Sequence, residues 1–176
     1  LTLFVNDMDE LTTALDIFDE FESISGLAIN RAKSEIMSIG PPIGLDTFQG
    51  LQIVNKITIT GYTHSFDHRK QVIEDNYRKA ITKAKTALNL CRTRGLSIKG
   101  RVMITKVWAY SQLQFVASLF PITDNAIKEF NQLIYRFVWK GAERTKRTRL
   151  AKPCADGGLD LPTPGSLSYA VMAMWA

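Results

Sequence analysis

The chain of 176 residues is 45% hydrophobic and 22% charged, with a net charge of +5, a composition typical of a folded globular protein and not of a disordered one. Its two cysteines, Cys91 and Cys154, form no CxxC pair, so neither a disulfide framework nor a zinc finger is expected. A metal site made by His64, His68 and Cys91 is disfavoured because the ligand number and spacing do not fit. The most apolar stretch, residues 107–120, contains four Ser and Gln residues, so it predicts a buried helix and not a membrane span.

Charge is unevenly distributed along the chain. Residues 1–30 contain seven acidic side chains and no Lys or Arg, whereas residues 67–106 contain eleven basic and three acidic side chains. Residues 140–152 contain six basic side chains and one acidic one. A surface that meets only solvent mixes the two signs, so this asymmetry predicts a polyanionic partner. For residues 67–106 alone, a solvated helix face without a partner is an equally good interpretation.

The first third of the chain is expected to mix helix and strand. Asn6 or Asp7 can cap a helix that ends at Gly26. Apolar residues recur in this helix at the spacing of one face: Leu11, Leu15, Phe18 and Phe21. Short strands are expected at residues 27–29, at residues 35–39 and around Gly61.

The middle of the chain is expected to form a bundle of three helices. The first runs from Asp67 to about residue 93, with one apolar stripe made by Ile73, Tyr77, Ile81, Ala84, Leu88 and Cys91. Ser97 can cap the second, which would bury Val102, Val107 and Leu113. Thr123 can cap the third, which would bury Ile127, Phe130, Ile134 and Phe137.

The end of the chain is expected to begin with an exposed basic loop at residues 140–152. A turn at residues 157–162 leads into an extended piece, and Ser166 can cap a last helix that reaches the end of the chain. The larger aromatic side chains in this half of the molecule are interpreted as core residues: Trp108, Tyr110, Phe115, Trp139 and Trp175.

Five short segments follow one another in an order that resembles a known family. They are SGLAINRAKSE at 25–35, ITITGY at 57–62, LSIKGRVMITK at 96–106, FVWKG at 137–141 and GGLDLP at 157–162. This order resembles the reverse transcriptase of LINE-type, non-LTR retrotransposons over nearly the whole chain. The resemblance implies an α+β, mostly α-helical fold. Residues 1–66 would be the C-terminal part of the palm, with a helix and short antiparallel strands. Residues 67–141 would be the helical thumb, a bundle of three helices. Residues 142–176 would be the start of the post-thumb region.

The resemblance also implies an enzyme, an RNA-directed DNA polymerase that is a nucleotidyltransferase. Its partners would be an RNA template, a DNA primer and deoxynucleotides, with Mg²⁺ or Mn²⁺ as cofactor and no membrane. The aspartate pair that holds the metal would lie just before Leu1, so this chain is expected to be a piece of a longer protein, to bind no metal and to be inactive alone. Asp7 and Asp9 fall at a helix entry, where capping is the expected role. The location would be the nucleus, a cytoplasmic ribonucleoprotein, or both.

The resemblance implies roles for residues of the first third. Lys33 would lie beside the phosphates of the incoming nucleotide, where an ammonium stabilises or protonates the leaving pyrophosphate. Asn30 and Gly26 would support its turn. Gly61 and Tyr62 would belong to a primer grip, although Ile-Thr precedes them where the family has an aromatic residue and Leu. The alternatives are a solvent-exposed lysine between strands and a glycine in an ordinary strand bend.

Basic residues cluster around the turn between the first two predicted thumb helices: Arg92, Arg94, Lys99, Arg101 and Lys106. Cations on a rigid element bind phosphates without sequence preference, so this cluster predicts contacts to the template–primer duplex. Two other functions fit the same charges. One is a non-enzymatic nucleic-acid-binding module built from basic helices, and the other is a helical protein-interaction domain with an acidic face.

Overall fold

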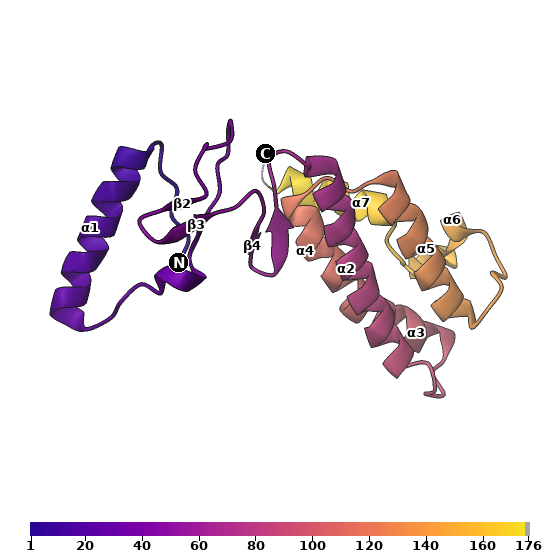
Figure 1. Ribbon diagram of the computed structural model, residues 1–176. Helices are drawn as coiled ribbons and strands as arrows, with labels where there is room; N and C mark the ends of the chain where they lie inside the picture. The colour runs from indigo at the N-terminus through magenta and orange to yellow at the C-terminus, as the bar shows by residue number, and fades with distance from the viewer. Residues whose placement is uncertain (175–176) are drawn as a thin grey trace. The chain divides into compact units, whose positions relative to one another are not determined.

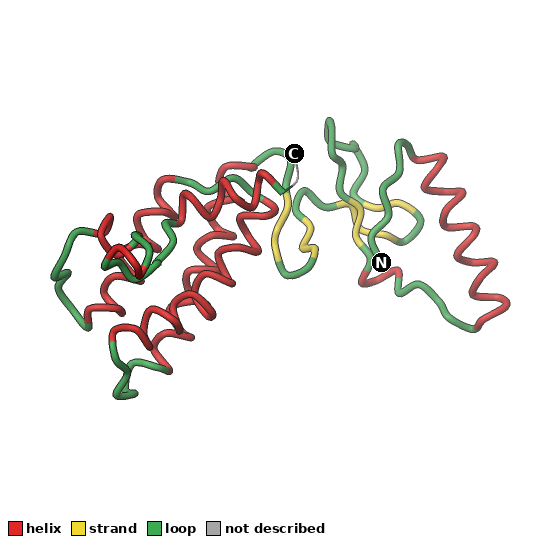
Figure 2. The backbone as a smooth tube through the Cα atoms, turned by 180° about the vertical axis from the view of Figure 1, so that it is seen from behind, coloured by secondary structure: helices red, strands yellow, loops and turns green. Residues whose placement is uncertain are grey.

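The computed structural model describes residues 1–174, which form two compact units (Figure 1). The first unit comprises Leu1–Ile57 and Ser65–Asp67, and the second comprises Thr58–His64 and the chain from His68 onward. The molecule is mostly helical with a few short strands in two small sheets, as Figure 2 shows, which confirms an α+β fold. The expected division into three segments differs from this one, because residues 58–64 and 142–174 both belong to the second unit.

The first unit contains one long helix and one small sheet. Helix α1 spans Met8–Ser25. The Asp7 side chain caps it by accepting the Glu10 N–H at 2.8 Å, and Gly26 ends it in the left-handed conformation with φ 70°. Leu11 and Leu15 are buried with Leu51 in a small core, whereas Phe21, expected on the same face, is 52% exposed.

The sheet of the first unit has the strand order β1-β3-β2, with β1 at Glu35–Ile36, β2 at Thr47–Phe48 and β3 at Leu51–Ile53. β2 and β3 are antiparallel, but β1 and β3 are parallel, so the expectation of an all-antiparallel sheet was wrong. The tight turn between β2 and β3 places β2 along one edge of β3, and β1 pairs with the other edge. Residues 27–29 form no strand because no neighbouring strand pairs with them.

The second sheet is a hairpin made by β4 at Ile57–Ile59 and β5 at Tyr62–His64. Thr60 and Gly61 form its turn with φ values of 52° and 85°. Two successive left-handed residues match the twist of a two-residue hairpin. Gly61 is therefore required by the turn itself, since a side chain at this φ is strained.

Helices form the bundle of the second unit. α2 spans Arg69–Leu90, α3 spans Ile98–Ile104, α4 spans Ser111–Leu119 and α5 spans Asp124–Trp139. All six residues of the predicted α2 stripe are buried, and α2 packs against both α4 and α5 (Figure 1). Ser97 caps α3 and Thr123 caps α5, as predicted. Ile127 and Phe137, expected in the core, are only half-buried.

A π-helical turn at Thr105–Tyr110 joins α3 to α4. In this turn each hydrogen bond joins residues five apart, not four apart as in an α-helix. The side chains that follow are therefore rotated about the helix axis, and different positions face the core. Val107, predicted in the core, is 58% exposed as a result, while Ala109 and Tyr110 are buried. Trp108 and Phe115 are 49% and 44% exposed, which also corrects their assignment to the core.

The end of the described chain is ordered around two short helices. α6 spans Arg147–Leu150 within the stretch expected to be a loop, and α7 spans Pro164–Ala173. Thr163, not Ser166, caps α7. Pro164 occupies the first helical position, where proline is favoured, so the helix begins earlier in the chain than expected. Trp139 is half-buried, and Trp175 lies outside the described residues. No helix within residues 1–174 is both long and apolar enough to cross a membrane.

Candidate nucleic-acid interface

The turn after α1 is held by Asn30. Its side-chain oxygen accepts the Lys33 N–H at 3.2 Å, and its carbonyl accepts the Ser34 hydroxyl at 2.9 Å. These bonds close a short 3₁₀ helix at Arg31–Lys33. The side chain of Lys33 is exposed and has no ion-pair partner among the described residues. The main chain of Lys33 is thus fixed while its ammonium group remains available to an anion.

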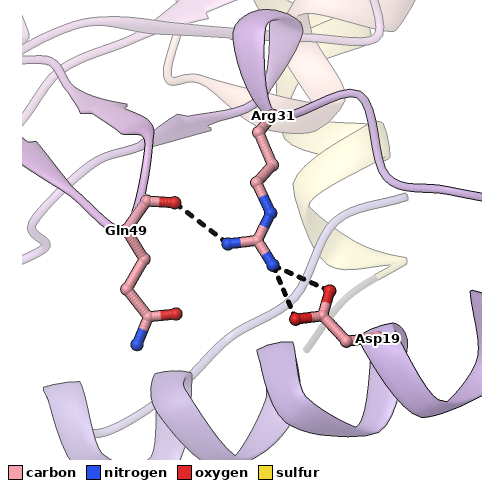
Figure 3. Close-up of polar contacts among 3 residues, drawn as sticks. All are labelled: Asp19, Arg31 and Gln49. Atoms are coloured by element: carbon pink, nitrogen blue, oxygen red, sulfur yellow. Dashed lines mark hydrogen bonds and ion pairs between the residues drawn. The ribbon is translucent and has the colours of Figure 1, made fainter.

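Arg31 anchors this turn to the rest of the first unit (Figure 3). Its Nη2 donates to both carboxylate oxygens of Asp19 in α1 at 2.7 and 2.8 Å, and its Nη1 donates to the Gln49 carbonyl at 3.0 Å. The guanidinium therefore joins the helix, the lysine turn and the β2–β3 turn. Sequence reasoning did not single out Arg31. A signal was present, because Arg31 is the first cation after seven acidic residues.

Tyr62, a predicted primer-grip residue, is 5% exposed. Its ring lies 5.0 Å from that of Phe115, and Lys83 Nζ lies 5.7 Å from its centroid. Burial raises the pKa of the Tyr62 hydroxyl. Tyr62 therefore anchors the hairpin to α4, while the space around a Cβ at Gly61 is open. Thr60 and Gly61 in the turn of this hairpin are exposed, whereas Tyr62 is buried.

The five predicted phosphate ligands divide into two groups. Arg92, Arg94 and Lys99 are exposed and have no ion-pair partner within residues 1–174. Arg101 is only 8% exposed, which differs from its expected position at the surface. Its Nε donates to the Val138 carbonyl at 2.6 Å and its Nη1 to the Leu96 carbonyl at 2.7 Å, so its guanidinium is engaged by the protein itself.

Lys106 is also engaged within the protein. Its Nζ lies 2.9 Å from Asp160 Oδ2 in the GGLDLP segment, and its side chain is 30% exposed. The Tyr110 hydroxyl donates to the Pro162 carbonyl in the same segment, and burial raises the pKa of this hydroxyl. The segments LSIKGRVMITK, FVWKG and GGLDLP therefore meet in the second unit, through Arg101, Lys106 and Tyr110.

Two glycines allow the GGLDLP segment to fold back on the chain before it. Gly157 has φ 74°, and a Cβ on Gly158 would lie 1.9 Å from the Lys152 carbonyl oxygen. This close approach lets the N–H groups of Leu159 and Leu161 both donate to the Leu150 carbonyl at 3.1 Å. Leu161 is fully buried. The segment is therefore a structural brace for the basic stretch at 140–152.

Two carboxylates, Asp7 and Asp9, lie at the start of α1. Asp7 is occupied as the cap of α1, and Asp9 lies in the first turn of that helix. Residues 1–174 contain no group of three or more His, Cys, Asp or Glu side chains placed to hold a metal ion.

We compared the chain with known proteins. No model of a known protein family matches it, and no curated protein matches it either. Membership of a family thus stays a prediction from the order of the five segments.

Proposed function

We propose that the chain is the C-terminal palm and the thumb of an RNA-directed DNA polymerase of the non-LTR retroelement type. The observation that carries the proposal is the turn after α1, which fixes the main chain of Lys33 and leaves its ammonium free. The order of the five segments and the basic end of the helical bundle support it. Mg²⁺ or Mn²⁺ would be held by carboxylates outside residues 1–174.

In this proposal Lys33 acts on the phosphate side of the incoming deoxynucleotide. When the primer 3′ oxygen attacks the α-phosphorus, the bond to the pyrophosphate oxygen breaks and negative charge develops on that oxygen. The ammonium of Lys33 stabilises this charge or transfers a proton to it. Lys suits proton transfer better than Arg because an arginine stays protonated in proteins.

The thumb part of the proposal assigns duplex binding to Arg92, Arg94 and Lys99, which surround the α2–α3 turn. Their side chains are exposed and unpaired within residues 1–174. Phosphate contacts of this kind hold any sequence, as a polymerase requires. Arg101 and Lys106 are left out of this set because the protein engages both.

The test is binding of an RNA–DNA hybrid of 20 base pairs to the 176-residue chain. We expect replacement of Arg92, Arg94 and Lys99 by Ala to weaken binding at least tenfold. The slope of log K against log salt should fall by about 2–3, because each lost phosphate contact removes about 0.9. Lys128→Ala, at an exposed lysine of α5, is the control and should change affinity less than twofold. Binding that is weak and insensitive to salt would overturn the proposal.

A second test separates the polymerase from a non-enzymatic binding module with the same basic helices. Reading the transcript upstream of Leu1 should give an aromatic-Ala-Asp-Asp sequence in frame. In the longer chain, Lys33→Ala should lower nucleotide incorporation at least tenfold and leave hybrid affinity within twofold. A coding sequence without a carboxylate pair upstream would favour the binding module.

A further inference from the structure

We propose that the basic segment, residues 140–152, is a second binding surface for the phosphate backbone of a nucleic-acid strand. Its cations are different residues from Arg92, Arg94 and Lys99, and Arg101 joins the two stretches by donating to the Leu96 and Val138 carbonyls. The inference rests on the proposed function in one respect only, the choice of nucleic acid as the polyanion.

The basic segment is held in place at Arg147 and at Leu150. Arg147 Nε lies 3.1 and 3.0 Å from the two carboxylate oxygens of Glu143, and the Arg147 guanidinium lies 4.7 Å from the centroid of the Tyr135 ring in α5. Leu150 is 3% exposed, and its carbonyl accepts the two N–H groups of the brace described above. Cations on a held backbone lose less entropy on binding than cations on a free loop.

Two of the three acidic residues within or just after this segment are already paired. Glu143 is paired with Arg147, whose hydrogen bonds lower the pKa of the carboxyl, and Asp160 is paired with Lys106. Asp156 is an exposed acidic residue in the turn that follows the segment. Five basic side chains are exposed and have no ion-pair partner among residues 1–174: Lys140, Arg144, Lys146, Arg149 and Lys152. The segment therefore presents a net excess of positive charge to solvent.

The composition of the surface favours phosphates on a nucleic acid over a membrane or a protein. Within residues 140–152 no large hydrophobic side chain is exposed, since Leu150 points into the core. A membrane-surface helix needs an exposed apolar face, and a stable protein interface needs an apolar centre. Arginine and lysine without apolar neighbours match the repeated charge of a phosphate backbone, and such contacts carry no sequence preference.

The experiment compares two charge-matched variants of the full chain. The test variant replaces three exposed cations of the basic segment by Gln: Arg144, Lys146 and Arg149. The control variant replaces three exposed lysines of α2 and α5 by Gln: Lys70, Lys85 and Lys128. Affinity for a 20-nucleotide single-stranded RNA and for an RNA–DNA hybrid of the same length is measured between 50 and 300 mM salt.

We expect the test variant to weaken binding at least tenfold on one or both probes, with a salt slope lower by about 2. The control should stay within threefold of the parent chain. A loss confined to the single strand assigns the surface to unpaired template, and a loss confined to the hybrid assigns it to the duplex.

Three results would overturn the inference. In the first, the variant at Arg92, Arg94 and Lys99 loses affinity but the test variant does not, which leaves the proposed function standing. In the second, no variant changes affinity, and both proposals fail. In the third, the chain binds phosphatidylserine vesicles more tightly than RNA and the test variant abolishes that binding, which assigns the surface to membranes.

Discussion

Arg101 links two helix ends through main-chain carbonyls, and Arg31 links a helix to two turns. Both guanidinium groups face the protein, whereas Arg92 and Arg94 face solvent. The five donors of a guanidinium in a fixed plane suit either role. The role of each arginine therefore depends on which carbonyls and carboxylates the fold brings within reach.

Replacing Arg101 by Ala should destabilise the second unit. The carbonyls of Leu96 and Val138 would each lose a charged donor in a buried place, so we expect a loss of about 2–4 kcal/mol in the free energy of unfolding. Urea unfolding followed by circular dichroism measures it. Arg94→Ala, at an exposed arginine, should stay within about 0.5 kcal/mol. An Arg101→Ala chain with parental stability and weakened hybrid binding would instead make Arg101 a phosphate ligand.

The Glu143–Arg147 pair should make stability depend on pH in the acid range. Hydrogen bonds from Arg147 lower the Glu143 pKa in the folded chain below its ordinary value of 4.5. The stabilising contribution is therefore complete above pH 4.5 and is lost as pH falls through the lowered pKa. NMR titration of the Glu143 carboxyl carbon should give a midpoint below 4.5, and Arg147→Gln should return it toward 4.5. A midpoint unchanged by Arg147→Gln would show that the pair does not persist in solution.

At the scale of elements, the β4–β5 hairpin depends on α2 for its position. Asn76 is fully buried in α2; its side-chain oxygen accepts the Thr63 N–H at 3.0 Å, and its amide donates to the Thr63 carbonyl at 2.7 Å. A two-stranded hairpin is marginally stable alone in water. The side-chain amide of Asn76 pairs with both main-chain groups of Thr63 at the edge of β5, as a neighbouring strand would.

Asn76→Leu should detach this hairpin from the bundle. It leaves the N–H and carbonyl of Thr63 without partners, so we expect a loss of about 2–4 kcal/mol in stability and faster hydrogen exchange at the Thr63 amide. Asn89→Leu, at an exposed asparagine of the same helix, is the control and should change neither quantity much. Equal effects of the two substitutions would contradict this role for Asn76.

At the scale of the whole molecule, the two units differ in the size of their cores. The core of the first unit has three buried residues, Leu11, Leu15 and Leu51, with partly buried neighbours. The second unit buries side chains from α2, α4 and α5 in one continuous cluster. Because stability grows with buried apolar surface, the second unit is expected to be the more stable one.

Native-state hydrogen exchange should resolve this difference. Amides of α1 should open at a lower free energy than those of α2 and α4. Leu15→Ala should speed hydrogen exchange in the first unit only, and Leu113→Ala should speed it in the second unit only. Each substitution should lower the free energy of unfolding of its own unit by about 2–5 kcal/mol. Uniform protection along the chain, or one shared response to both substitutions, would show a single cooperative unit.

The local structure around the candidate site was predicted in part. Asn30 caps the short helix at Arg31–Lys33 and Gly26 ends α1, because a cap and a left-handed glycine act over a few residues. Arg101 was assigned to the surface because its neighbours in sequence are basic, whereas its actual partner, Val138, is 37 residues away. Lys106 likewise meets Asp160 at a separation of 54 residues. Local sequence carries no signal for such distant partners.

The sequence by itself determined helices α1, α2 and α5, the caps of α1, α3 and α5 and the buried stripe of α2, since apolar periodicity and capping depend on residues within one or two turns. It also determined where positive charge accumulates. Only the tertiary structure decided that Arg101 and Lys106 are engaged by the protein, because their partners Val138 and Asp160 lie far along the chain. It also decided the phase of the helix after Thr105, where a π-helical turn exposes Val107, and the parallel pairing of β1 with β3. These outcomes depend on long-range packing, which overrides local preference.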